Sequence, residues 1–363
     1  MKITDWNVRA FDVPMRSPYR SAQRTTTTAH NVLLIVTVDG EHAGVGESAP
    51  ATYVTGETQE IVRTAIERFF SGHAPDSPES VLARAQTDLA ASPGALGAVE
   101  IAVQDAVARA NGVPLYRLLN HATSTEPGIL RRTTDLSLPL LSPEEAGRRA
   151  ADAHGFRAFK IKVGVGDIAE DVARVRAVAD AAPHSTLRLD GNQAFTPATA
   201  FALLDGLTDL FARIELFEQP TAANDDAAML AVHRALPNAI PVFADESCHD
   251  AEDARRLIEG GICGGVVLKL AKSGLSGASK IVKAVREAGG TCLFGCMMET
   301  RIGIGAALHL AVALGETVVP MLDLDGHLLT YDAGLLTGGF TQIADVLEIA
   351  PGTLGLGVSV VDV

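Results

Sequence analysis

The sequence is poor in cysteine, has a deficit of positive charge and contains no long apolar run. Its four cysteines form no Cys-x-x-Cys pair, so neither a disulfide framework nor a zinc ribbon is expected in this chain of 363 residues. Lysine and arginine total 30 against 44 acidic residues, and the net charge of −14 argues against nucleic-acid binding, which needs a basic face. No stretch of about 18 uncharged apolar residues occurs, and residues 1–14 alternate like a strand rather than a signal peptide. We therefore expect a cytoplasmic protein that binds neither nucleic acid nor membrane.

Apolar residues are plentiful, at 47% of the chain against 20% charged residues. This balance supplies a sizeable core and excludes disorder of the whole chain. At roughly 150 residues per domain, the length fits two or three domains, or one large barrel with an addition.

The first 120 residues predict strands followed by helices. A β-branched run at 31–38 ends at Asp39-Gly40, a hairpin turn signal, and 44–47 continues on the far side. Apolar residues then recur at helical spacing from 57 to about 120. Strands and then helices, without alternation, indicate an α+β domain.

From about residue 130, short apolar strands alternate with helical segments. The expected strands are 159–163, 186–190, 214–218, 242–245, 266–269 and 291–295, with a weaker one at 136–140. The expected helices between them include 168–182, 197–207, 225–236, 251–259 and 277–288. The repeat length is close to the roughly 31 residues of one unit of a (β/α)₈ barrel, which we predict. A doubly wound open sheet is the alternative, but Gly164-Val-Gly166 lacks the third glycine of its phosphate-binding turn.

Charged residues stand at the ends of the successive strands. In chain order they are Lys160 and Lys162, Asp190, Glu218, Asp245, Lys269, Glu299 and Asp323. A single charge at a strand end is usually a helix cap or a solvated rim charge. In a barrel, however, all these ends converge on one mouth, and their near-constant interval predicts a functional site there.

Three acids come from three consecutive strands. Asp190, Glu218 and Asp245 would lie side by side and repel one another without a cation. Oxygen ligands alone, with no His or Cys at these positions, favour a hard ion such as Mg²⁺. Asn192 and Glu246 lie next to these acids and are expected to orient them. The alternative is a network of salt bridges with the flanking lysines.

The lysines are expected to oppose one another. Lys160 and Lys162 are two residues apart and face the same way, on the second strand if 136–140 is the first. Lys269 ends the sixth strand, across the mouth. A lysine near other cations loses proton affinity and becomes usable as a base near neutral pH. Two opposed lysines and a divalent ion predict removal of a proton next to a carboxylate on one face and its return on the other.

Six short segments match the motifs of one enzyme family. Each is weak alone, but their order and spacing together are specific for that family. They are Lys160-Ile-Lys162, Asp190-Gly-Asn192, Glu218-Gln-Pro220, Asp245-Glu-Ser247, Leu268-Lys-Leu270 and Cys296-Met-Met-Glu-Thr-Arg-Ile-Gly303. This layout resembles the enolase superfamily, whose members stabilise an ene-diolate with Mg²⁺ and a Lys or His base. It is most similar to the muconate-lactonizing-enzyme subgroup, over nearly the whole chain.

The resemblance implies an α/β fold: a (β/α)₇β TIM-type barrel with an α+β capping domain. We expect the cap at 1–125, the barrel at 126–325, and a tail at 326–363 that returns to the cap. The resemblance also implies roles at the mouth. Asp190, Glu218 and Asp245 would hold one Mg²⁺ per subunit, Lys162 and Lys269 would be the acid/base pair, Lys160 would hold the substrate carboxylate, and Glu299 would be a supporting residue.

Two features point to dipeptide epimerases within the subgroup. Asp323-Leu-Asp325 resembles the element with which those enzymes bind a dipeptide's α-ammonium group, since residues two apart on a strand share a face. Arg24-Thr-Thr and 53–57 resemble the loops that close over the substrate, and Arg24 resembles the residue that reaches the glutamate side chain in Ala-Glu epimerases. Met298, in the last matching segment, is also expected at the substrate.

We therefore predict a Mg²⁺-dependent epimerase of dipeptides, an isomerase, acting at the α-carbon of the C-terminal residue. A dehydratase of a cyclic amino acid such as cis-3-hydroxyproline and an N-acylamino-acid racemase are the alternatives within the subgroup. A non-catalytic binder on the same scaffold is a further alternative, against which the two opposed lysines argue. We expect a homo-oligomer, and the sequence leaves its size and the particular dipeptide open.

Overall fold

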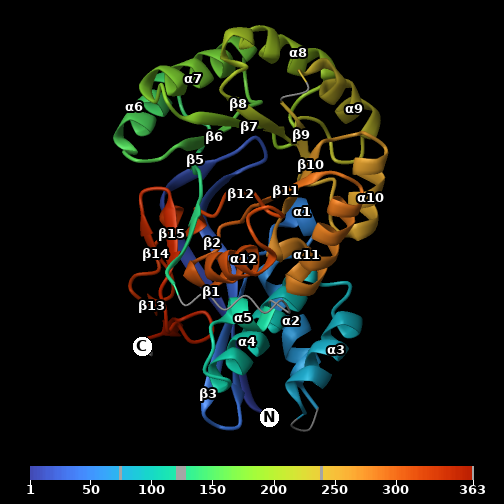
Figure 1. Ribbon diagram of the computed structural model, residues 1–363, viewed down its shortest axis with the longest axis vertical. Coiled ribbons are helices and arrows are strands. Elements are labelled where there is room, and N and C mark those ends of the chain that lie inside the picture. Colours follow the sequence, from blue (N-terminus) through green and yellow to red (C-terminus); the bar gives the residue numbers. More distant parts are fainter. Residues whose placement is uncertain (73–75, 120–127, 238–239, 362–363) are drawn as a thin grey trace.

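The computed structural model describes residues 1–72, 76–119, 128–237 and 240–361. Figure 1 shows a ring of strands surrounded by helices, which the middle of the chain forms, above a smaller body of strands and helices from the blue N-terminal part. The red C-terminal segment runs beside both. No helix in the described ranges is long and apolar enough to cross a membrane.

Eight parallel strands form the larger body. Their order in the sheet is β12-β11-β10-β9-β8-β7-β6-β5, so each strand pairs with its neighbour in sequence. The strands are β5 (Leu136–Leu138), β6 (Ala158–Lys162), β7 (Thr186–Asp190), β8 (Ile214–Glu218), β9 (Val242–Ala244), β10 (Gly265–Leu268), β11 (Thr291–Phe294) and β12 (Met321–Leu322). A hydrogen bond from the Asp135 amide to the Leu322 oxygen, at 3.3 Å, joins the last strand to the chain entering the first.

Seven helices connect these strands: α6 (Pro143–Asp152), α7 (Ile168–Ala181), α8 (Pro197–Asp205), α9 (Asp226–Ala235), α10 (Ala251–Glu259), α11 (Leu270–Glu287) and α12 (Arg301–Leu314). This is the expected (β/α)₇β barrel, and the open doubly wound sheet is excluded. The expected start of α11 at residue 277 was wrong. That helix begins seven residues earlier, and the non-helical Gly274, with φ of 65°, hides its first turn from a periodicity argument.

Strand periodicity sorts the barrel side chains into two layers. Phe159 and Ile161 of β6 point to the helices and join the main core, whereas Lys160 and Lys162 point to the barrel interior and its mouth. Beneath the charged mouth the interior is apolar: Leu216, Phe243, Val267 and Leu293 form a separate buried cluster. The first three stand two residues before Glu218, Asp245 and Lys269 on the same segments, so both layers of the interior follow from alternation along the strands.

The barrel helices begin at capping residues that the sequence places directly after each strand loop. Six of the seven start with a side-chain oxygen that accepts a main-chain N–H of the first turn, from Ser142, Asp167, Thr196, Asp225, Asp250 and Thr300. The exception is α11, which starts directly after Lys269. Lys269, the N-cap residue, makes no capping hydrogen bond with its side chain, which lines the pocket at the barrel mouth instead.

The cap consists of an antiparallel sheet covered by helices. Strands β1 (Ile3–Arg20), β2 (Thr25–Val38) and β3 (His42–Ser48) pair in that order, as the hairpin signal at Asp39-Gly40 predicts. The helices are α1 (Thr52–Thr55), α2 (Gln59–Phe70), α3 (Pro78–Asp88), α4 (Pro93–Ala110) and α5 (Leu115–Leu119). Helix α4 lies so close to β3 that a Cβ on Gly46 would be 2.1 Å from the Ala98 oxygen, which explains the glycine there.

The tail after the barrel returns to the cap. It contains α13 (Gly326–Leu329), β13 (Leu336–Gly338), β14 (Thr341–Ile343), β15 (Val346–Ile349) and β16 (Val358–Val360), and β15 pairs with β4 (Leu130–Thr133). Gly355 exchanges main-chain hydrogen bonds of 2.9 Å with Leu115 and Val113 of the cap. The expected boundary between cap and barrel, after residue 125, lies outside the described residues. The expected boundary between barrel and tail, after residue 325, coincides with the start of α13. We keep this division as a proposal.

One buried carboxylate ties the cap to the barrel. Glu47 at the end of β3 accepts hydrogen bonds from the Thr300 amide, the Thr300 hydroxyl and the Gly303 amide, at the start of α12. Asn31 of β2 donates to it as well, at 2.7 Å. Burial raises the pKa of Glu47, although these hydrogen bonds oppose the shift. The carboxylate thus caps a barrel helix from the other domain.

Replacing Glu47 by alanine is expected to destabilise the protein by about 3 kcal/mol, because buried donors on both domains lose their acceptor. Urea unfolding curves of wild type and variant provide the test. The control is Glu60→Ala on α2, an exposed side chain whose loss is expected to cost less than about 0.5 kcal/mol. Equal stabilities of the two variants would contradict a role for Glu47 in joining the domains.

Candidate active site

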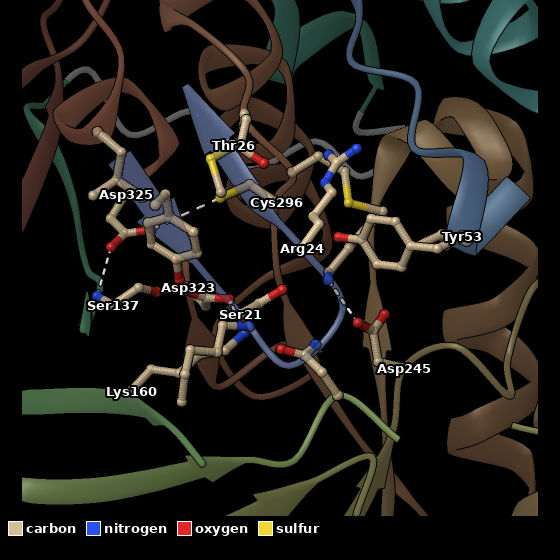
Figure 2. A pocket seen from close by; sticks show the side chains of 18 of the residues that line it. Ser21, Arg24, Thr26, Tyr53, Ser137, Lys160, Asp245, Cys296, Asp323 and Asp325 are labelled. Atoms are coloured by element: carbon tan, nitrogen blue, oxygen red, sulfur yellow. Dashed lines mark hydrogen bonds and ion pairs between the residues drawn. The ribbon is translucent and has the colours of Figure 1, made fainter. Parts of the chain in front are cut away.

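A pocket lies where the carboxyl ends of the barrel strands meet the cap loops (Figure 2). Both domains line it. The lining residues are Tyr19, Ser21, Arg24, Thr26, Tyr53, Val54, Ser137, Lys160, Lys162, Asn192, Asp245, Glu246, Lys269, Cys296, Met297, Met298, Asp323, Asp325 and Leu329. Most of the residues expected at the mouth are therefore brought together. Asp190 and Glu218 lie fully buried beside them, and Glu299 is buried outside the lining set.

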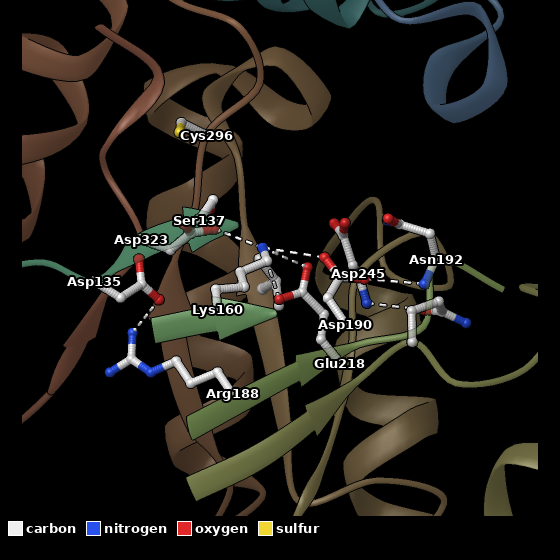
Figure 3. Close-up of polar contacts among 12 residues, drawn as sticks. Asp135, Ser137, Lys160, Arg188, Asp190, Asn192, Glu218, Asp245, Cys296 and Asp323 are labelled. Atoms are coloured by element: carbon white, nitrogen blue, oxygen red, sulfur yellow. Dashed lines mark hydrogen bonds and ion pairs between the residues drawn. The ribbon is translucent and has the colours of Figure 1, made fainter. Parts of the chain in front are cut away.

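Lysine ammonium groups lie between the buried carboxylates. Lys160 Nζ is 2.9 Å from Glu218, 3.3 Å from Asp190 and 2.7 Å from Asp323 (Figure 3). Lys162 Nζ is 2.5 Å from Asp190. The salt-bridge network that the sequence offered as the alternative is thus present, built from the residues expected to bind the cation.

The neighbouring cation Lys160 lowers the pKa of Lys162 and of Lys269, as expected, but nearby carboxylates raise both pKa values by more. Burial by itself lowers the pKa of Lys162, but Asp190, together with Tyr19 and Glu218, raises it above the usual value. Burial likewise opposes the charge of Lys269, yet Asp245 raises its pKa well above the usual value. The physical reason is that each ammonium touches a carboxylate, whereas the argument from sequence counted only the other lysines.

The pKa values of the buried acids Glu218 and Asp245 are shifted as well, in opposite directions. Burial raises the pKa of Glu218 to about 8, and the neighbouring Asp190 adds to the shift. Burial also raises the pKa of Asp245, but Lys269 and Lys272 outweigh it, and the pKa falls below the usual range. Glu218 therefore lacks sufficient positive charge in its surroundings, although a lysine touches it.

The donor set fits a hard divalent cation. In the described part of the chain no three His, Cys, Asp or Glu side chains are arranged to hold a metal ion as they stand, because ammonium groups separate the carboxylates. Several buried side-chain oxygens of the described residues accept no hydrogen bond, and three of them lie at this site: Glu218 Oε2, Asn192 Oδ1 and Glu246 Oε2. Of these three, Glu218 Oε2 has an ion-pair partner, Lys160 Nζ at 2.9 Å. We propose Asp190, Glu218 and Asp245 as the ligands of one Mg²⁺, with Asn192 and Glu246 beside them.

Hydrogen bonds hold the proposed ligands in place. The main-chain N–H of Asn192 donates to the Asp190 carboxylate at 2.9 Å, and the side-chain amide of Asn192 donates to the Glu246 carboxylate at 3.4 Å. Gln219 Oε1 accepts from the amides of Asp245 and Ser247, at 2.9 and 3.2 Å. These contacts fix the ends of β7, β8 and β9 relative to one another.

The two aspartates after β12 differ in their surroundings. Asp323 is paired with Lys160, whereas Asp325 accepts the Ser137 amide at 2.6 Å. The Ser137 hydroxyl donates to Asp323 at 3.2 Å, so one residue of β5 orients both carboxylates (Figure 2). Burial raises the pKa of Asp325 to about 7, and Asp323 adds to it. An additional cation next to Asp325 would relieve this shift.

The cap contributes residues from both segments that were expected as loops. Arg24 lies directly before β2, whereas Tyr53 lies in the short helix α1 and not in a loop. The Arg24 guanidinium lies 4.8 Å from the centre of the Tyr53 ring, and both side chains line the pocket (Figure 2). Gln23 donates to the Asn192 main-chain oxygen at 2.7 Å, which joins this loop to the barrel mouth. Met298 lines the pocket as expected, and its main-chain oxygen accepts a hydrogen bond from Asn31.

Glu299 lies behind the pocket. Burial raises the pKa of its carboxyl to about 8, and the nearby Glu47 adds to the shift. Its Oε2 accepts no hydrogen bond among the described residues. We propose it as a supporting residue and not as one that touches a substrate.

Several residues of the site were missed by the argument from sequence. Ser137, Tyr19 and Cys296 line the pocket, and Lys272 and Gln219 hold a proposed ligand. Ser137 pairs in register with Lys160 on the neighbouring strand, but the three-residue strand β5 shows too little alternation to mark Ser137 in the sequence. Tyr19 carries no such signal, because it comes from the cap.

Comparisons with known proteins agree with this site. A family model described as "Enolase C-terminal domain-like" matches residues 143–362, and the "Mandelate racemase / muconate lactonizing enzyme, N-terminal domain" matches residues 4–120. The chain belongs to the mandelate racemase and muconate lactonizing enzyme family of the enolase superfamily. Like the epimerases to which it is similar, it is an isomerase.

Curated relatives match over their full length. The chain is 32% identical to the L-Ala-D/L-Glu epimerase of Bacillus subtilis, over 99% of this chain and 97% of that protein. It is 34% identical to the hydrophobic dipeptide epimerase of Enterococcus faecalis, over 99% and 100%. Members of the family that share its architecture thus differ in the dipeptides they are named for.

The fold of the chain also matches the solved structures of these relatives. The substrate-liganded L-Ala-D/L-Glu epimerase of Bacillus subtilis superposes with a TM-score of 0.89, at 32% identity over 99% of both chains. The dipeptide epimerase of Enterococcus faecalis in complex with Mg and the dipeptide L-Leu-L-Tyr gives 0.88, at 33% identity over 99% of this chain and 100% of that one.

Proposed function

We propose that this isomerase is a Mg²⁺-dependent dipeptide epimerase. The observation that carries the proposal is the placement of Lys162 and Lys269 on β6 and directly after β10, with β7, β8 and β9 and their buried acids between them. A non-catalytic binder needs no such opposed pair. The two relatives named above support the same reaction: both are epimerases by name, and the dipeptide epimerase of Enterococcus faecalis was solved in complex with Mg and a dipeptide.

The proposed reaction inverts the α-carbon of the C-terminal residue of the dipeptide. One lysine, Lys162 or Lys269, removes the α-proton from its side, and the other donates a proton to the opposite side. Lys160 holds the substrate carboxylate by charge. Bound Mg²⁺ supplies positive charge that stabilises the negative charge developing on that carboxylate. Cap residues Arg24 and Tyr53 cover the pocket and keep water away from the carbanion.

The carboxylates after β12 distinguish a dipeptide from an N-acylated amino acid. A dipeptide brings a free α-ammonium group into the mouth, and a buried cation requires a partner. Asp325 is placed to be that partner, since its carboxylate accepts hydrogen bonds only from the Ser137 amide and the Cys296 thiol among the described residues and is paired with no lysine or arginine there. We had expected Asp323 to be equally available, but it is paired with Lys160.

Changing both Asp323 and Asp325 to asparagine is expected to lower kcat/KM for dipeptides by on the order of 10²-fold, because a charge-assisted hydrogen bond is typically worth about 1.5–3 kcal/mol. Turnover of an N-succinyl amino acid should fall far less. The single variant Asp325→Asn removes only the proposed partner of the substrate ammonium group and leaves the ion pair between Asp323 and Lys160 intact, so its kcat/KM reports on the ammonium contact alone. Equal losses on both substrate types, or a wild-type preference for the N-acylated one, would favour the racemase alternative.

The proposed function is tested by incubating the enzyme with Mg²⁺ and a dipeptide library in D₂O. Mass spectrometry is expected to find one deuterium at the α-carbon of the C-terminal residue in the accepted dipeptides. A loss of water from cis-3-hydroxyproline without exchange into any dipeptide would instead support the dehydratase alternative. The dipeptides that exchange define the substrate class.

A further inference from the structure

Two cavities meet at the segment between β11 and α12, residues 295–300. Met297 and Met298 of this segment line the active-site pocket, and both also line a second cavity of about 190 Å³. Arg24 lines both cavities as well. The remainder of the second cavity, the cap cavity, is lined by cap residues within 28–31, 49–52 and 57–59. The two methionines therefore separate the active-site pocket from the cap cavity.

The segment that carries the methionines has no regular structure of its own. Residues 295–300 form neither helix nor strand, and Met298 is half-buried. A methionine side chain has three rotatable bonds and adapts to the space around it. The position of this segment therefore depends on hydrogen bonds that neighbouring elements make to its main chain.

Asn31 on β2 supplies such a hydrogen bond from the cap. Its side-chain NH₂ group donates to the Met298 main-chain oxygen at 2.9 Å and to Glu47 Oε1 at 2.7 Å. Both amide protons are thus used, and the orientation of the amide is determined. Asn31 is 2% exposed, and Gln59 donates to its main-chain oxygen at 2.7 Å. The group that holds Met298 is therefore itself held in place.

Glu47 holds the same segment at its other end. It accepts the main-chain N–H of Thr300, two residues after Met298, at 3.0 Å. Loss of the Asn31 donors would release Met298 while Glu47 still binds Thr300. The resulting movement should therefore be confined to the methionines, and the space next to them is the cap cavity.

We propose that Asn31 is a positioning residue that sets the side-chain selectivity of the active site by holding Met298 between the two cavities. The proposal rests on the proposed epimerase function. With Met298 held, the pocket limits the size of the substrate side chain that fits. Without this hydrogen bond, the segment moves into the cap cavity, and larger neutral side chains gain room. Neutral side chains are the class affected, because the methionines carry no charge.

The test compares Asn31→Leu with the wild type on accepted dipeptides that differ only in the size of one neutral side chain. Leucine is similar in size to asparagine but donates no hydrogen bond. The ratio of kcat/KM for the largest over the smallest side chain is expected to rise by on the order of 10-fold, the discrimination that about one methylene gives in an apolar pocket. The change should lie mainly in KM, because Asn31 does not line the active-site pocket.

Asp105→Asn on α4 is the matched control. Asp105 is also a buried polar residue of the cap, and it accepts the main-chain N–H groups of Val45 and Leu356 at 2.9 and 2.6 Å. It lines neither of the two cavities. This variant should lower the stability of the cap without changing the ratio. Should Asn31→Leu fail to fold, Asn31→Ser carries the same expectation, because one hydroxyl proton cannot serve both acceptors.

A second measurement does not depend on activity. The chain has six methionines, and labelling their methyl groups with ¹³C gives each a signal in NMR spectra. The Met298→Leu variant identifies the signal of Met298. Asn31→Leu is expected to shift or broaden this signal and to leave that of Met229, in the core under α9, unchanged.

The outcomes separate the two proposals. An unchanged ratio, equal losses for all side chains, or an unchanged Met298 signal would overturn the role of Asn31 while leaving the epimerase intact. Absence of α-proton exchange from every dipeptide in the wild-type enzyme would overturn the proposed function itself.

Discussion

Replacing either Lys162 or Lys269 by alanine is expected to lower kcat/KM for epimerisation by at least about 10³-fold, within the range that a positioned general acid or base contributes. Inversion needs a base on one face and an acid on the other, so neither lysine can substitute for the other. The measurement is polarimetry or chiral chromatography of an accepted dipeptide. Each single variant should still exchange the α-proton of one stereoisomer with solvent, because the remaining lysine serves that face.

A matched control uses the same helix. Lys283→Ala on α11 removes an exposed lysine, 76% exposed, and should leave kcat/KM unchanged. Circular dichroism of all three variants shows whether the barrel is intact. Epimerisation by Lys269→Ala at the wild-type rate would refute the two-base assignment.

Removal of divalent metal with EDTA is expected to abolish epimerisation, and Mg²⁺ is expected to restore it. The negative charge that develops on the substrate carboxylate needs a Lewis acid, and the lysines nearby are already paired with Asp190 and Asp245. Glu218→Gln should reproduce the loss at ordinary Mg²⁺ concentrations, since it removes one of three proposed ligands. Calorimetric titration with Mg²⁺ checks that the loss reflects weaker binding.

Asp209→Asn is the control for this second prediction. Asp209 is an exposed acid paired with Arg176 on the outside of the barrel, and its loss should alter neither Mg²⁺ binding nor rate. Full activity of the metal-free enzyme would show that the three buried acids serve only as partners of the lysines.

The fold could be predicted largely from the sequence because its strands are short, buried and evenly spaced. Strands buried on both faces read as apolar runs, and their interval matches one barrel unit. The start of α11 was missed because Gly274 breaks its helical pattern. Ser137 was missed because β5 is only three residues long and its inward positions do not stand out.

What the sequence by itself determined is which side chains reach the barrel mouth, because chain order and strand alternation are local properties. The acids, the lysines and Asp323 could be named on that basis. Only the tertiary structure decided which lysine forms an ion pair with which carboxylate. Lys160 on β6 pairs with Asp323 after β12, past the intervening β5; Lys272 completes the surroundings of Asp245, and Tyr19 lines the pocket from the cap. Charge pairing and pKa shifts depend on distance and burial between segments far apart in the chain, and no local pattern contains that information.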